Sequence, residues 1–471
     1  MDIYINGVQY IHTYTGGIDM DRKIETKTAY LLLVICLILI AGCVLLNLSL
    51  VYGFAASIVL ALAFFRSQGF SVRELAGMMA RGLGECRTLY VLILLIGATV
   101  SIWLASGVVP AMIYYGFEYM KGMNFLFAAF LIVALSSVFM GTAVGTVSTI
   151  GLAILGIGKG FGIPTAVLLG AIVSGAFIAD KISPISGLLN LTLSSTNTSY
   201  KNAFRSMLVT LLPTLLLTAG IYYYIGLRFR IGSNLTEVVR FQAAIREGFF
   251  ISPFLLLVPA LIVIISFCGV KIVYSILTGL LGGTAISLFL QKMALAEVLR
   301  AVLLGYRADT ASVRLNEILK SGGMVSMLEV VLIVMGAIAL SSIFEGTGLI
   351  TLIIDKVVAK TGNKGEMVLK TGLISSILTI VTCDQTLGIV LPGRLLRDRY
   401  DRLGMKREVL ARTISDTGTI IAPLMPWNVN SLIIGLIAGM KAAYAPFAVL
   451  CYISPLTTVI YGLVVRRKAI K

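Results

Sequence analysis

Four polar clusters interrupt apolar stretches of this chain, and each contains side chains that could bind a small ion. In the first cluster, Thr142, Thr146 and Ser148 provide hydroxyl oxygens, which are hard donors suited to Na⁺. Gly141 and Gly145 are expected to let the backbone unwind there and free carbonyl oxygens as further ligands. The other interpretation of this cluster is close helix packing through small residues.

The second cluster adds charge to an otherwise apolar stretch. Ionisable groups inside a membrane are costly, so their default interpretation is functional. Pro184 is expected to end a helix locally and free a backbone carbonyl. The alternative is an Asp180–Lys181 pair at a membrane interface. The candidate ion- or substrate-binding residues of this cluster are Asp180, Lys181, Ser183, Ser186 and Asn190.

The third and fourth clusters lie in the second half of the chain. Asp384 follows the apolar stretch 371–381 and precedes 387–392, so it is the strongest candidate for an intramembrane carboxylate. Asp416 is the next candidate, although Arg412, one helical turn earlier, could neutralise it. The candidate site residues here are Asp384, Gln385, Thr386, Asp416, Thr417, Thr419, Trp427 and Asn428.

A carboxylate among hydroxyls can hold either Na⁺ or H⁺. Burial favours the neutral acid, and a bound cation favours the carboxylate. Competition at one such site is sufficient for cation/proton exchange. We therefore expect Na⁺ at Asp384 and Asp416, Na⁺ and H⁺ as coupling ions, and no other cofactor. A histidine-based centre is not expected, because His12 is the single histidine.

The composition indicates which elements position these residues. Of 471 residues, 58% are hydrophobic and 13% are charged, whereas soluble domains carry about 25% charged residues. The chain is therefore expected to be an all-α polytopic membrane protein with about 10–12 transmembrane segments. The uncharged stretch 28–65 has room for two helices, with a turn at 47–49.

The net charge of +16 comes largely from basic loops between apolar stretches. The positive-inside rule and anionic lipid explain such loops without nucleic acid. Arginines in 66–87 favour a cytoplasmic N-terminus. We expect a multi-pass protein of the cytoplasmic membrane of a prokaryote. Its expected partners are the bilayer, a small cation or small organic solute, and a second copy in a homodimer.

Sequence landmarks recur at a spacing of about 240 residues, which predicts two duplicated halves. The expected organisation is a polar segment 1–27, a first repeat 28–226, a basic linker 227–249, a second repeat 250–465 and a basic tail 466–471. Repeats with helices broken near the midplane are typical of secondary transporters. The matched landmarks are Gly84 with Gly323, Gly97 with Gly336, Gly107 with Gly348, Gly141-Thr142 with Cys383-Asp384, Ser174-Gly175 with Ser415-Asp416, and Asn190 with Asn430.

At these motifs the chain resembles the NhaC family of Na⁺/H⁺ antiporters, which also includes malate/lactate antiporters and amino-acid permeases. The resemblance implies inverted repeats, broken helices and secondary transport. The chain departs from the family at Gly187-Leu188-Leu189, where the family's pattern resembles Asp-Thr-Thr. This loss of oxygen ligands predicts weaker Na⁺ coupling. The matching segments are Leu104–Gly107, Gly141–Gly151, Asp180–Ser186, Asp384–Arg394 and Asp416–Asn428.

Other classes of function explain these features less well than antiport does. A carboxylate or amino-acid transporter would place Leu188 and Leu189 at an apolar substrate surface, with Lys181 or Arg394 at a carboxylate. An enzyme is not expected, because the motifs of aspartyl intramembrane proteases are not found in an apolar stretch. A passive channel gives no reason for corresponding breaks in two halves.

Overall fold

A computed structural model describes residues 26–119, 123–229, 235–268, 270, 272–358, 361–440 and 442–468. The described residues are almost wholly helical, and their only β-type pairing is an isolated bridge between Arg307 and Lys320. The predicted N-terminal segment 1–27 lies outside the described residues except for its last two, and so does the end of the predicted tail.

Nine helices among these residues are long and apolar enough to cross a membrane, or up to eleven if each of two bent helix pairs counts as one span. This confirms the prediction of an all-α polytopic membrane protein. The expected first hairpin is also present. Helix α1 (Thr26–Leu45) ends before Asn47, and α2 (Leu50–Ser67) begins after Ser49, whose hydroxyl accepts from the Val51 N–H.

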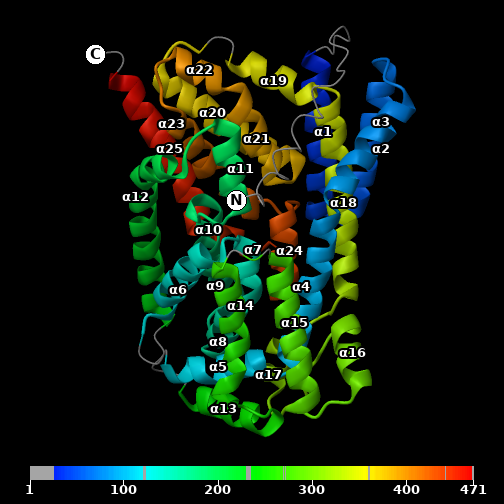
Figure 1. Ribbon diagram of the computed structural model, residues 1–471, viewed down its shortest axis with the longest axis vertical. Coiled ribbons are helices and arrows are strands. Elements are labelled where there is room, and N and C mark those ends of the chain that lie inside the picture. The colour runs from blue at the N-terminus through cyan, green and yellow to red at the C-terminus, as the bar shows by residue number, and fades with distance from the viewer. Residues whose placement is uncertain are drawn as a thin grey trace. The chain divides into compact units, whose positions relative to one another are not determined.

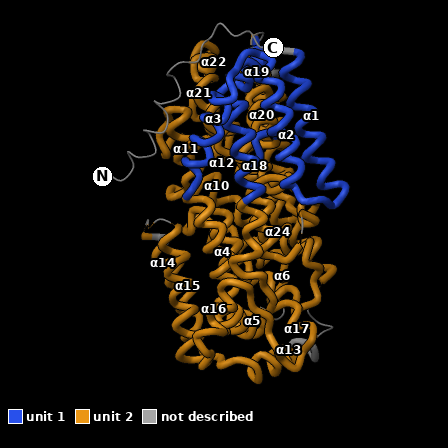
Figure 2. Tube along the Cα trace, turned by 90° about the vertical axis from the view of Figure 1, so that its right-hand side faces the viewer, with its two compact units in different colours: residues 1–87, 332–361, 381–383 blue, residues 88–331, 362–380, 384–471 orange. Residues whose placement is uncertain are grey.

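The chain forms two compact units, each made of separated segments (Figure 2). Unit 1 comprises residues 1–87, 332–361 and 381–383. Its helices are α1, α2, α3 (Val72–Glu85), most of α18 (Leu328–Gly346) and α19 (Leu349–Val358). Glycines allow close helix approach in this unit. A Cβ on Gly53 would lie 3.1 Å from Cys43 Sγ, and one on Gly336 would lie 2.8 Å from Phe54 Cβ.

Unit 2 contains all the predicted site residues, and Figure 1 labels its main helices. Two π-helical turns, η3 (Val147–Gly151) and η7 (Ser415–Thr419), continue α7 and α23. The helices lying wholly or mostly in unit 2 are α4 (Arg87–Ala105), α5 (Val108–Tyr119), α6 (Phe125–Met140), α7 (Ala143–Thr146), α8 (Leu152–Gly160), α9 (Thr165–Ala176), α10 (Ile178–Ile182), α11 (Gly187–Thr196), α12 (Tyr200–Gly226), α13 (Leu235–Gly248), α14 (Leu257–Phe267), α15 (Ile272–Phe289), α16 (Leu295–Leu304), α17 (Val313–Ile318), α20 (Lys364–Thr382), α21 (Gln385–Leu395), α22 (Arg397–Arg402), α23 (Arg407–Ile414), α24 (Val429–Ala438) and α25 (Val449–Lys468).

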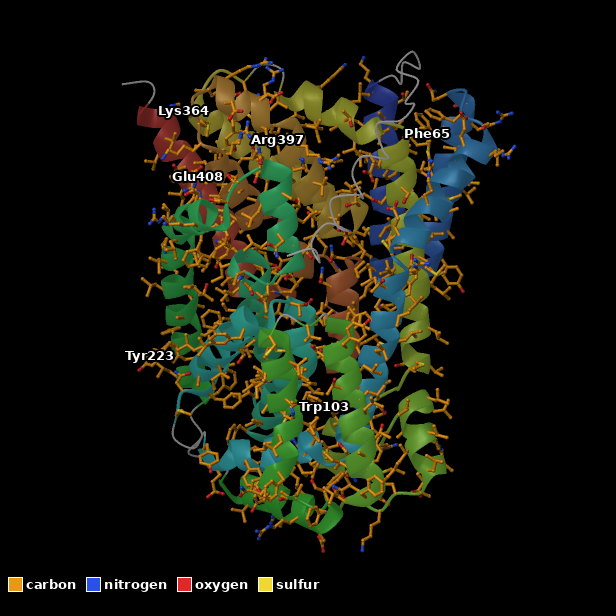
Figure 3. The ribbon with its side chains drawn as sticks, in the orientation of Figure 1. Phe65, Trp103, Tyr223, Lys364, Arg397 and Glu408 are labelled. Atoms are coloured by element: carbon orange, nitrogen blue, oxygen red, sulfur yellow. The ribbon has the colours of Figure 1, made fainter. Side chains whose placement is uncertain are left out.

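Buried polar side chains fix the long helices of unit 2 around the broken ones. The Tyr222 hydroxyl of α12 lies 2.7 Å from Ser174 Oγ of α9 and accepts from the Val449 N–H of α25 at 3.2 Å. In the same unit, Trp103 of α4 donates its indole N–H to the Gly279 carbonyl of α15 at 3.0 Å (Figure 3). These bonds satisfy buried groups that would otherwise be costly in an apolar interior.

The helix breaks show the same backbone conformation at several positions separated by about 240 residues. Left-handed φ angles occur in three such pairs, and in two pairs they end a helix just before the next begins. The domain boundaries drawn from the repeat stay a prediction. The pairs are Gly107 (φ 77°) and Gly348 (φ 74°), Gly141 (φ 68°) and Cys383 (φ 61°), and Asn197 (φ 51°) and Gly439 (φ 68°).

Candidate functional site

Four helices of unit 2 begin within apolar sequence, and a predicted site residue caps the N-terminus of each. Such caps satisfy N–H groups that have no partner inside the helix. The breaks also contact one another, since α10 packs against α7 and η7, and α24 packs against α7. The caps are Thr142 (to Gly145 N, 3.5 Å), Ser186 (to Leu189 N, 3.4 Å), Asp384 (to Thr386 N, 2.9 Å) and Asn428 (to Asn430 N, 3.0 Å).

A buried ion pair between Lys181 of α10 and Asp416 of η7 lies where these breaks meet. The two side chains are 1% and 0% exposed. Asp416 Oδ2 also accepts from Thr458 Oγ1 at 2.9 Å, and its Oδ1 accepts from Ser454 Oγ at 3.5 Å. The carboxylate is therefore surrounded by one cation and two hydroxyls.

This pairing differs from both alternatives considered from the sequence. Arg412 is not the partner of Asp416. Its guanidinium lies 3.9 Å from the ring centroid of Tyr461, and it donates to the Ser206 carbonyl at 3.4 Å. The local spacing of four residues indicated the wrong basic partner, because the Arg412 side chain packs against α12 and α25 instead.

Asp180 is the second buried carboxylate, with 5% of its surface exposed. Its carboxylate accepts from Ser186 Oγ at 3.5 Å and from the N–H of Ala143, the first residue of α7. Within the described chain it forms no ion pair, because the neighbouring Lys181 is directed to Asp416. Asp180 therefore has a hydroxyl and a positive helix end as partners, but no cationic side chain.

Asp384, which the sequence indicates as the strongest candidate for an intramembrane carboxylate, is not the most buried one. It is only partly buried, and it caps α21 through the N–H of Thr386, whose side chain is exposed. Asp180 and Asp416 are both more buried. The apolar residues on either side of Asp384 belong to helices that end and begin at this position, so the carboxylate lies in the break itself.

Three of the predicted hydroxyls are buried and donate to backbone carbonyls one turn earlier along the same broken helix. Thr146 donates to Thr142 O at 2.7 Å, Ser148 to Gly145 O at 3.0 Å, and Thr417 to Thr413 O at 2.6 Å. Their oxygen lone pairs remain for a cation. Gly145 lies inside α7, so the prediction that it unwinds the backbone is wrong. Gly141 does interrupt the helix as expected, through a left-handed conformation at the end of α6.

Ser183 and Asn190 hold the first-half break together. Ser183 donates to Val138 O at 2.6 Å, which ties the break to α6. The Asn190 side chain donates to Pro184 O at 3.2 Å and to Ser186 O at 2.9 Å. These side chains therefore bond to backbone carbonyls on both sides of the break, and Ser186 O accepts from the Asn190 N–H as well.

An amide network joins the second-half breaks. Gln385 Nε2 donates to Thr419 O at 2.6 Å, and Asn430 Nδ2 lies 3.0 Å from both Gln385 Oε1 and Asn428 Oδ1. Trp427 donates its indole N–H to Ile380 O at 2.9 Å. The structure thus brings together Gln385, Thr419 and Asn428, three of the predicted residues.

Sequence reasoning missed the two hydroxyls on α25 that contact Asp416. Ser454 and Thr458 lie four residues apart in an apolar stretch, which places them on one helix face and could have indicated them. Leu189 has a different position from the one expected for a substrate-lining residue. It packs in a buried cluster with Ala203, Met207 and Ala411.

The known proteins that this chain is similar to are antiporters. Residues 188–465 match the model of the Na⁺/H⁺ antiporter family. The chain is 30% identical over 397 residues to the malate-2H⁺/Na⁺-lactate antiporter of Bacillus subtilis (strain 168), covering 84% of this chain and 85% of that one. It is 28% identical over 446 residues to the Na⁺/H⁺ antiporter NhaC of Alkalihalophilus pseudofirmus, with 94% and 96% covered. An arginine/ornithine antiporter of Halobacterium salinarum is 27% identical over 392 residues, with 82% and 80% covered.

Proposed function

Because the chain belongs to the Na⁺/H⁺ antiporter family, it is a secondary active transporter, and we propose that it exchanges Na⁺ for protons at Asp180. The multiple apolar helices place it in a membrane. We also propose the cytoplasmic membrane of a prokaryote, in keeping with its bacterial and archaeal relatives. A homodimer remains part of the proposal.

The pairing of the buried charges carries this assignment. The carboxylates of Asp180 and Asp416 are buried, and so are the cations of Lys181 and Arg412. Lys181 is directed to Asp416 and the Arg412 guanidinium lies over the Tyr461 ring, so among the described residues no cation pairs with Asp180. Leaving the second carboxylate charged and unpaired in an apolar interior costs several kcal/mol. One proton or one monovalent cation removes that cost. Since both cannot occupy the same carboxylate, binding of one releases the other.

The neighbours of Asp180 suit such a competition. Ser186 Oγ contacts the carboxylate, and Thr142 caps the helix whose first N–H meets Asp180. Hydroxyls and carboxylates are the hard oxygen ligands expected around Na⁺. The Lys181 ammonium already occupies the position at Asp416 where the sequence predicts Na⁺, so we assign the exchanging cation to Asp180 instead.

The test is exchange in proteoliposomes, with an entrapped pH dye reporting proton movement after a Na⁺ gradient is imposed. Asp180→Asn keeps the shape but removes the charge, and it should lower the exchange rate about tenfold or more, which equals about 1.4 kcal/mol. The double variant Lys181→Met with Asp416→Asn removes the ion pair and preserves Asp180. It should retain most of the exchange.

Folding of each variant is checked by gel filtration before reconstitution. Full exchange by Asp180→Asn would refute the assignment. So would loss of exchange in a folded double variant, because the ion pair would then be part of the exchange step rather than its scaffold.

A transporter of carboxylates or amino acids was the alternative function. In that alternative, the sequence analysis expects Lys181 or Arg394 to bind the substrate carboxylate, but Lys181 forms an ion pair with Asp416. Any organic substrate would therefore need other donors, and the described residues contain a set of them near α24.

A further inference from the structure

The N-terminus of α24 contains buried hydrogen-bond donors that the cation site does not use. Asn428 caps this helix and is 0% exposed, yet its Nδ2 has no partner among the described residues. Thr419 Oγ1 is likewise buried without a partner. We propose that Asn428 and the N-terminus of α24 bind the carboxylate group of a small organic acid. This rests on the proposed function only in that the chain is a transporter.

The orientation of the Asn428 amide is set by its neighbours. Its Oδ1 accepts from Asn430 N at 3.0 Å and from Asn430 Nδ2 at 3.0 Å. Rotating the amide by half a turn would direct its NH₂ group at two other donors, so the observed orientation is the consistent one. The Nδ2 group therefore cannot exchange places with Oδ1, and it lacks an acceptor among the described residues.

The acceptors of the same network are already occupied. Gln385 Oε1 accepts from Asn430, and Thr419 O accepts from Gln385 Nε2 at 2.6 Å. What remains unused is the Asn428 NH₂ group and the Thr419 hydroxyl. A buried unsatisfied donor is costly, and a ligand that offers acceptors removes the cost. A carboxylate offers acceptors only, so it matches this set.

Electrostatics distinguish a carboxylate from a cation here. The N-terminus of a helix carries partial positive charge and stabilises anions. Helix α24 has ten residues, and α7, whose N-terminus is also capped at the breaks, packs against it. A cation would meet the NH₂ group rather than the oxygen of Asn428. The nearby Asp384 directs its carboxylate to the Thr386 N–H at the start of α21, which offsets part of its charge.

The test is ligand-induced stabilisation of the purified full chain in detergent. Potassium lactate and potassium acetate are the probes, and potassium chloride and lactamide are the controls for salt and shape. Both carboxylates should raise the unfolding temperature in a saturable way, whereas the controls should not. Potassium salts keep Na⁺ out of the assay.

Variants of Asn428 identify the site. Asn428→Ser keeps a capping oxygen but removes the amide NH₂ donors, and it should weaken lactate binding about tenfold. Asn428→Asp also keeps the cap and should abolish binding through its added charge. The matched control is Asn124→Asp, at the N-cap of α6, where the side chain accepts from Phe127 N at 3.3 Å. This control should bind lactate as the wild type does.

The outcomes separate this inference from the proposed function. The inference is wrong if lactate and acetate fail to stabilise the wild type. It is also wrong if they stabilise Asn428→Ser and Asn428→Asp as much as they stabilise the wild type. Na⁺/H⁺ exchange measured without any carboxylate is independent of that result. Conversely, carboxylate binding together with full exchange by Asp180→Asn would overturn only the proposed function.

Discussion

At the scale of single residues, the Lys181–Asp416 pair makes a prediction about stability. Removing one partner leaves an unpaired buried charge, so Asp416→Asn should lower the free energy of unfolding by about 3–5 kcal/mol. Adding Lys181→Met to this variant removes the remaining charge and should restore most of the loss. Thermal unfolding in detergent, followed by tryptophan fluorescence, measures both variants.

The opposite order of stabilities would contradict the pairing. If the double variant unfolds at the same temperature as Asp416→Asn, the lysine charge is compensated elsewhere. Asp401→Asn is a suitable control, because its carboxylate accepts from exposed Arg407 at 2.7 Å. The guanidinium of Arg407 lowers the pKa of this exposed carboxyl group. An exposed pair of this kind contributes little to stability.

The sequence predicted the members of this pair but not the pairing. Intramembrane charges could be recognised because they interrupt apolar stretches. Lys181 and Asp416 belong to opposite halves of the chain, so their contact depends on tertiary packing. Local spacing favoured Arg412, whose side chain contacts Tyr461 and Ser206 instead.

At the scale of elements, the break before α7 depends on Gly141. This residue has a φ of 68°, and an added Cβ would lie 3.0 Å from Ile185 Cδ1 and closer still to Cγ1. Gly141→Ala should lower stability by about 1–2 kcal/mol from the left-handed conformation alone. Exchange should fall too, because α7 supplies the Ala143 N–H to Asp180. Thermal unfolding and proteoliposome exchange measure the two effects.

Gly187→Ala provides the matched comparison. Gly187 is the first residue of α11, and an added Cβ would meet nothing within 4 Å. Alanine there should leave stability unchanged or raise it slightly, by up to about 1 kcal/mol. Equal effects of the two alanines would show that the left-handed turn at Gly141 is not required.

The positions of the breaks could be predicted better than their conformations. Glycine, proline and polar residues marked the interruptions at Gly141, Pro184 and Asp384. Glycine content alone could not show that Gly141 is left-handed and Gly145 helical. Cys383 adopts φ 61° although it is not glycine, and the sequence did not predict this conformation; only its alignment with Gly141 in the repeat could have indicated it.

At the scale of the whole molecule, composition was sufficient for the fold class. A chain with 58% hydrophobic residues needs a bilayer as its solvent. Inside the bilayer, a spanning helix satisfies the hydrogen-bonding groups of its own backbone. Contacts between distant segments could not be predicted in this way. Unit 2 combines residues 88–331, 362–380 and 384–471, so its packing draws on both predicted repeats.

The orientation of the chain gives the last prediction. The segment 66–87, most of which is helix α3, contains four arginines and two glutamates, whereas the turn at 46–49 is uncharged. The positive-inside rule therefore places the start and end of the α1–α2 hairpin in the cytoplasm and its turn outside. Leu46, which is 72% exposed, and the exposed Arg81 report on the two sides. In a Cys86→Ser, Cys268→Ser background, which removes the two cysteines that are not buried, Leu46→Cys should react with an impermeant maleimide in intact cells. Arg81→Cys should react only after lysis. The reverse pattern would invert the hairpin, because a single helical hairpin returns to the side on which it began.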